Sequence, residues 1–148
     1  MTDTDYRRLS DFRFSLRRFL DFSQAAARSS GLTPQQHQIL LAIKGLMLSG
    51  DSRIGRIAER LLLRHHSTVE RVNRLAALKL VRKSTDPEDR RRVQVVLTAK
   101  AEKLLAALSA THLEELRRLR PSLQVILDLD DRRSRTAKRK TARRSGKS

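Results

Sequence analysis

The sequence contains no cysteine, so neither a disulfide framework nor a thiol-based sensor is available to it. It also has no glycine-rich phosphate loop, no nucleophile with a suitably spaced base, and no paired carboxylates on a common face. We therefore predict that the protein is not an enzyme and uses neither a metal nor another cofactor.

No apolar run in the sequence is long enough to cross a bilayer, and the first residues are acidic, unlike those of a signal peptide. We therefore expect no membrane partner and a cytoplasmic location at the nucleoid. Positive charge is what the chain has in excess, since 33 Lys and Arg against 16 Asp and Glu give a net charge of +17 over 148 residues. The simplest partner for such a charge is a polyanion.

Residues 52–98 indicate two helices followed by two strands, which is the order of a winged helix-turn-helix. In the second helix, Val69, Val72, Leu75 and Ala76 recur at helical spacing and predict its apolar face. The opposite face suits the major groove, because small polar groups and arginines can bond to base edges and phosphates. The residues that we assign to this face are Ser67, Glu70, Arg71 and Arg74. A solvated surface helix is the alternative.

Two features at and after this helix add candidate contacts. The adjacent His65 and His66 point in different directions on a helix, so we assign them to bases or phosphates rather than to a metal site. Beyond the helix, alternating residues after an Asp-Pro turn predict a hairpin with basic residues at and beside its tip. A flexible arginine on such a tip can enter the narrow minor groove, although a solvated loop is the alternative. The basic residues of the hairpin assigned to DNA are Arg82, Lys83, Arg90 and Arg91.

Several motifs in a fixed order make the chain resemble the MarR family of bacterial transcriptional regulators. They are RIAERL at 56–61, HHSTV at 65–69, RL at 74–75, LVR at 80–82, DPEDRR at 86–91 and LT at 97–98. The resemblance is strong over this central stretch and weaker across the flanking helices from Leu9 to Leu129. It implies a homodimer that binds a pseudo-palindromic operator in double-stranded DNA and is often released by a small anionic or aromatic ligand.

Carried over residue by residue, the resemblance places Ser67, Thr68 and Arg71 against bases and phosphates. Asp89 and Arg91 match the Asp-x-Arg pair of the family's wing, in which the aspartate orients the arginine for the minor groove. The family's peroxide-sensing switch is excluded, because it is a cysteine. Lys79 stands where the family usually has a glycine, which makes a left-handed helix end less favourable.

Helices at both ends of the chain are predicted to form a dimerisation layer. We expect a single domain over residues 1–130, with dimerisation helices at 5–30 and 98–130 around the winged helix-turn-helix at 33–97. It would be mainly α-helical with a small β-wing. The first helix carries an apolar stripe of Leu9, Phe12, Leu16, Phe19 and Leu20, while Phe14 and Phe22 lie outside this stripe. This is more apolar surface than one small core can cover, so we expect a second copy of the chain to bury the rest.

Local signals set the other helix ends. Thr33, Pro34 and Gln36 predict a helix start with a capping box, and Thr98 is expected to cap a long helix that Pro121 stops before a short closing one. His37 is a speculative ligand residue, because the ligand cleft of the resembled family lies near the dimer helices. A core or surface histidine is the more ordinary explanation.

Residues 131–148 hold nine Lys and Arg against one Asp, which is +8 of the net charge. Without large apolar residues this segment is predicted to be a disordered tail that grips phosphates without reading sequence. A tail without a role, or one that binds RNA or an acidic protein, is the alternative.

These features predict a sequence-specific DNA-binding transcriptional regulator, a repressor, that acts as a homodimer. The alternative is a nucleoid-architectural or RNA-binding protein that binds charge without reading sequence.

Overall fold

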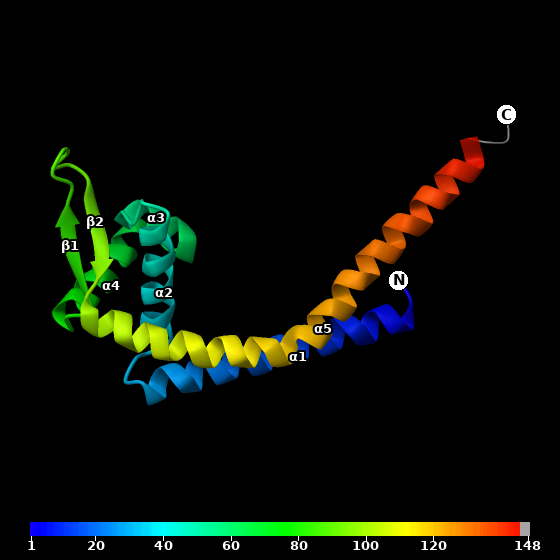
Figure 1. Ribbon diagram of the computed structural model, residues 1–148, viewed down its shortest axis with the longest axis horizontal. Helices are drawn as coiled ribbons and strands as arrows, with labels where there is room; N and C mark the ends of the chain where they lie inside the picture. The colour runs from blue at the N-terminus through cyan, green and yellow to red at the C-terminus, as the bar shows by residue number, and fades with distance from the viewer. Residues whose placement is uncertain (146–148) are drawn as a thin grey trace. The chain divides into compact units, whose positions relative to one another are not determined.

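The computed structural model describes the backbone of residues 1–145, with the side chains of residues 1–125 and of Asp128. Over this range the chain is mostly helical with one two-stranded antiparallel sheet, which confirms the predicted fold class (Figure 1). The elements are α1 (Asp3–Ser29), α2 (Pro34–Leu48), α3 (Ile54–Leu61), α4 (His65–Ala77), β1 (Val81–Thr85), β2 (Val93–Leu97) and α5 (Ala99–Ser145). Within the described residues, no helix is both long and apolar enough to cross a membrane.

The chain divides into two compact units. The winged unit is Ser23–Thr111, and the terminal unit combines Met1–Phe22 with His112–Ser148. The winged unit is wider than the expected 33–97, because the end of α1 and the start of α5 contribute Ala27, Ala101, Leu105 and Leu108 to its core. Three short helices and a hairpin have too little apolar surface to enclose a core alone, so these flanking segments cover it.

The centre of the winged unit is a set of fully buried side chains from α2, α3, α4 and β2. They are Leu40, Ile43, Ile57, Val72, Leu75 and Val95. α2 contacts α3 and β2, while α4 contacts α3 and β1. This packing fixes α4 and the hairpin on one common core.

The helix starts follow the sequence signals. The Thr33 hydroxyl accepts from the Gln36 N–H at 3.1 Å, and the Gln36 side chain accepts from the Thr33 N–H at 2.8 Å. This reciprocal pair confirms the predicted capping box of α2. The cap at Thr98 is also confirmed, because its hydroxyl accepts from the Ala101 N–H at 3.3 Å.

Helices α1 to α4 are each followed by a left-handed residue. These residues are Gly31 (φ 78°), Gly50 (φ 82°), Leu62 (φ 54°) and Lys79 (φ 57°). After α4, the Leu80 N–H donates to the Leu75 carbonyl and the Lys79 N–H to that of Ala76, both at 2.9 Å. This is a Schellman motif, so the family's left-handed turn is kept although lysine replaces glycine.

Leu62 provides a test of the strain at these ends. Its side chain is 93% exposed, so it offers almost no packing in return for a left-handed backbone. We expect Leu62→Gly to raise the free energy of unfolding by about 0.5–1 kcal/mol, measured by urea denaturation. Leu62→Ala is the control, because it removes the exposed side chain but keeps Cβ. An equal gain in both variants would contradict backbone strain as the cause.

The hairpin pairs β1 with β2 in a register from Val81 opposite Leu97 to Thr85 opposite Val93. Val95 and Leu97 are buried, while Val93 is 36% exposed. In the described structure Arg53 and Ile54 form no third strand beside the hairpin, since α3 begins at Ile54.

A contact at Ser52 takes the place of that strand. Its carbonyl accepts from the Val95 N–H at 3.0 Å, and the Gln94 side-chain oxygen accepts from the Ser52 N–H at 2.7 Å. Ser52 is thus joined to β2 by hydrogen bonds to the backbone of Val95 and to the side chain of Gln94, and no further strand is needed.

In the terminal unit, α1 and α5 run antiparallel. Phe19 and Phe22 each place a ring edge-on to that of His112, with centroids 5.9 Å and 5.8 Å apart, and the hydroxyls of Ser15 and Ser122 are 3.3 Å apart. The predicted stripe on α1 is thereby divided. Phe12 and Phe19 are half-buried, whereas Leu9, Leu16 and Leu20 stay exposed.

Helix α5 does not stop where the sequence predicted. It continues through Pro121, so the expected break and short closing helix are wrong. Proline removes one helical hydrogen bond, and the turns on either side keep theirs. The helix also runs through 131–145, where the sequence predicted disorder; alanine, arginine and lysine favour helix, and extending an existing helix needs no new nucleus. Residues 146–148 of the predicted tail lie outside the described residues.

Candidate nucleic-acid interface

Helix α4 is the second helix of the helix-turn-helix, the position that is called the recognition helix in this motif. Its inner face consists of the buried Thr68, Val72 and Leu75, while Val69 is only half-buried. At the start of the helix, the buried face therefore contains Thr68 in place of the predicted Val69. On the outward side lie residues from almost the full length of the helix, with Ser67 and Arg71 half-buried and the others exposed: His65, His66, Glu70, Asn73 and Arg74.

Thr68 does not belong to this outward face. Its side chain is 1% exposed, and its hydroxyl donates to the Arg64 carbonyl at 3.0 Å. The expectation that Thr68 contacts DNA is therefore corrected. The hydroxyl is satisfied within its own helix, which lets a polar residue occupy the core.

Asn73 is an outward residue that the sequence patterns did not lead us to predict. It is exposed and lies one helical turn after the exposed Glu70. An amide can donate to and accept from a base edge at once. The periodicity of the buried residues in α4 was a signal that could have found it.

The wing tip is built from two aspartates that hold the backbone. One carboxylate oxygen of Asp86 accepts from the Glu88 N–H at 2.9 Å, and one of Asp89 accepts from the Arg91 N–H at 3.0 Å. Such Asx turns are typical of aspartate in tight loops. Asp89 and Arg91, which match the family's Asp-x-Arg pair, are joined here by a side-chain to backbone hydrogen bond, and this bond holds the backbone at Arg91.

The basic side chains of the wing are all open to solvent. Arg82 and Lys83 are exposed on β1, and Arg90 and Arg91 are exposed at the tip. The winged unit as a whole holds 16 Lys and Arg against seven Asp and Glu, a net charge of +9. The structure therefore presents a polar helix face and a basic hairpin within one strongly positive unit.

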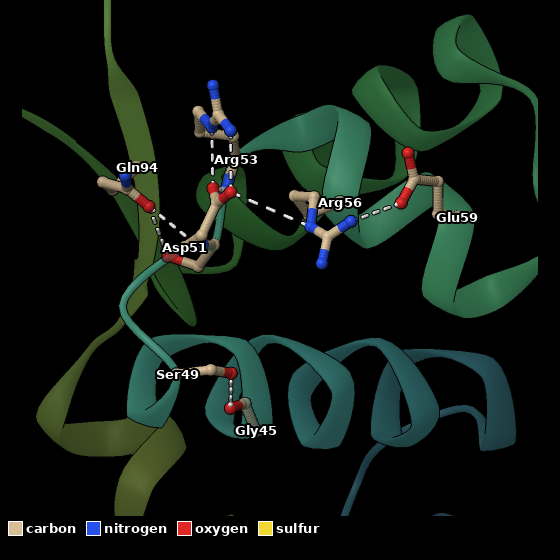
Figure 2. Close-up of polar contacts among 8 residues, drawn as sticks. Gly45, Ser49, Asp51, Arg53, Arg56, Glu59 and Gln94 are labelled. Carbon is tan, nitrogen blue, oxygen red and sulfur yellow. Dashed lines mark hydrogen bonds and ion pairs between the residues drawn. The ribbon is translucent and has the colours of Figure 1, made fainter.

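A charged network stands at the start of α3, the supporting helix (Figure 2). Asp51 accepts two hydrogen bonds from the Arg53 guanidinium, both at 2.7 Å, and Arg56 lies 3.8 Å from the same carboxylate. Arg56 also pairs with Glu59 at 2.8 Å. The hydrogen bond from the Arg53 side chain is the main cause that lowers the pKa of Asp51 to about 2. These arginines are engaged with carboxylates at the start of α3.

His37 lies in the core of the winged unit. It is 4% exposed on α2, among the buried Ile39 and Leu40. A hollow of about 440 Å³ opens elsewhere on the winged unit, and its lining consists of Leu46, Ser49, Arg56, Glu59 and Arg60. The burial of His37 fits the more ordinary role of a core histidine, and its speculative ligand role stays a prediction.

Comparison with known proteins agrees with this geometry. Residues 30–92 match the model of the MarR family, whereas no curated protein is significantly similar to the chain. AbsC, a MarR family transcriptional regulator from Streptomyces coelicolor, has a TM-score of 0.65 and 20% identity, over 96% of this chain and 97% of that one. A single-residue mutant of S. aureus MepR, bound to an oligodeoxyribonucleotide, has a TM-score of 0.62 and 18% identity, over 96% and 99%.

A third solved structure is BpsR of Bordetella bronchiseptica, whose DNA binding is regulated by 6-hydroxynicotinic acid. It has a TM-score of 0.58 and 23% identity, over 82% of this chain and 89% of that one. At these identities the likenesses show a shared fold. The segment matched by the family model runs from just before α2 to the wing, and it contains the whole recognition helix. Residues 30–92 are thus similar to the MarR family, and the chain as a whole shares the fold of solved MarR family regulators.

Proposed function

We propose that this protein is a transcriptional regulator, a repressor, that binds a pseudo-palindromic operator in double-stranded DNA as a homodimer at the nucleoid. One observation carries the proposal: the outward face of α4 and the tip of the wing offer base-reading side chains on one rigid core. Arg74 can meet guanine with two hydrogen bonds, and Arg91 on the hairpin tip suits the minor groove. The oligonucleotide bound to S. aureus MepR supports the same partner.

The exposed apolar residues of the terminal unit support the homodimer. On α1 the exposed fractions are 41% for Leu9, 42% for Leu16 and 45% for Leu20. On α5 they are 38% for both Leu116 and Leu123. Two helices cannot cover these side chains themselves, and a second copy would remove them from water. The dimer would carry two recognition helices, spaced about 34–36 Å apart to read successive major grooves.

Release by a small anionic or aromatic ligand is the finer part of the proposal. The regulation of BpsR by 6-hydroxynicotinic acid supports it. Such a ligand would act by binding one arrangement of the two recognition helices more tightly than the other.

The second candidate is an architectural or RNA-binding protein that binds charge alone. The net charge of +17 favours it, because sequence-independent binding needs only cations. It gives no role to the polar, uncharged side chains on the outward face of α4.

The test is a selection of fragmented genomic DNA by the purified protein at roughly 200 mM salt, where binding through charge alone fades. The bound fragments are sequenced. We expect one inverted repeat to be enriched, with half-sites about 10 base pairs apart from centre to centre. Recovery of DNA without any enriched sequence would contradict the regulator and favour the architectural protein.

A further inference from the structure

The net positive charge of this chain is confined to two segments. One is the winged unit, at +9, and the other is residues 131–148, at +8. The remaining parts, 1–22 and 112–130, hold eight cations and eight anions and are neutral together. Along the chain, the second basic segment is therefore separated from the winged unit by residues 112–130, which hold three cations and four anions, and it calls for a role of its own.

The backbone of the second segment is helical as far as Ser145, since it continues α5. Residues 131–145 make about four turns with a length of roughly 22 Å. At about 100° per residue, the eight cations of this stretch are spread over roughly two-thirds of the helix circumference. The remaining third has only small residues, namely Ser134, Ala137, Thr141 and Ser145.

This distribution selects the kind of partner. A helix that lies on a lipid surface needs an apolar face, and a helix that packs on another helix needs an apolar stripe. Ala137 and Ala142 are the only apolar residues of the segment 131–148, so neither condition is met. A helix with cations around most of its circumference suits a dense array of phosphates.

We propose that the basic end of α5, residues 131–145, forms a second DNA-binding element, one that contacts the phosphates of the duplex beside the operator without reading sequence. The choice of operator-flanking DNA rests on the proposed function, whereas phosphate binding rests on the charge of the segment. Duplex DNA carries one charge per about 1.7 Å, so a helix of this length can lie beside more phosphates than it has cations. The element is part of the same chain as the winged unit, and its high effective concentration near bound duplex favours that duplex over free RNA.

The test compares two variants that lose the same charge at different places. The tail variant carries Arg139→Gln, Lys140→Gln and Arg143→Gln. The control carries Arg7→Gln, Arg13→Gln and Arg117→Gln, all exposed in the terminal unit. Glutamine keeps helix propensity, so length and helicity should be matched, and circular dichroism would check this.

Dissociation constants are measured by fluorescence anisotropy from about 50 to 400 mM salt. The probes are a duplex holding the selected repeat, a scrambled duplex and an RNA duplex of equal length.

In the tail variant, we expect the slope of log affinity against log salt to fall by about 2–3 per chain on both DNA duplexes. The preference for the repeat should be unchanged, and the control should keep the wild-type slope. Equal changes in tail variant and control would overturn the proposal, as would a loss confined to RNA. If the full chain prefers no sequence but the tail variant still lowers the slope, the regulator fails and the phosphate-binding element stands. If the full chain prefers the repeat but the tail variant leaves the slope unchanged, the phosphate-binding element fails and the regulator stands.

Discussion

The double variant Leu16→Glu with Leu116→Glu is expected to be monomeric at micromolar concentration and to bind the operator at least about 100-fold more weakly than the wild type. Both leucines are exposed in the terminal unit, at 42% and 38%. In the proposed dimer they would be buried, where an unpaired carboxylate is strongly unfavourable. A monomer keeps the contacts of one half-site and loses the avidity of two linked sites.

Analytical ultracentrifugation measures the oligomeric state, and anisotropy with the selected duplex measures the affinity. Ser10→Glu is the control, because it adds a carboxylate to an exposed position of the same helix α1. Circular dichroism would show whether the variants keep their helices. A double variant that stays dimeric, or a folded monomer that binds with full affinity, would refute the proposed assembly.

Arg91→Ala is expected to weaken binding to the operator by about 10- to 100-fold while binding to random DNA changes little. The reason is geometric, since Asp89 accepts a hydrogen bond from the Arg91 backbone N–H at 3.0 Å and so holds the backbone from which this side chain extends. An arginine in the minor groove gains from the focused negative potential of a narrow groove, which depends on sequence.

Arg90→Ala is the matched control, because Arg90 is the exposed neighbour and its loss removes the same charge. Competition anisotropy with operator and random duplexes gives the two affinities for each variant. If both variants lose equally on both duplexes, the wing acts only through its charge, and the assignment of Arg91 as a groove-reading residue fails.

Several parts of the fold were predictable because they depend on residues close in sequence. The capping box of Thr33 and Gln36, the cap at Thr98 and the hairpin after Asp86 follow from local hydrogen bonds, and all are present. The order of supporting helix, recognition helix and hairpin was enough to predict the fold class. Even the left-handed turn at Lys79 kept its place, since the bonds of the Schellman motif outweigh the strain of a Cβ.

The incorrect predictions arose where one sequence pattern was compatible with two structures. Thr68 and Val69 are adjacent in α4, and hydrophobicity alone favours Val69 for the core. The structure buries Thr68 because its hydroxyl can bond to the Arg64 carbonyl while its methyl group packs. Likewise, Pro121 stops a helix in isolation, but α5 is long enough to lose one bond and continue.

The sequence by itself determined the mainly helical class, the winged helix-turn-helix, the order of its elements and the segregation of positive charge into two segments. These are properties of spacing and composition, which act over a few residues. Only the tertiary structure decided which face of α4 is outward, that His37 lies in the core, and that the end of α1 and the start of α5 complete the winged unit. Burial is shared among elements distant in the chain, so no single helix contains the information on which of its faces is covered.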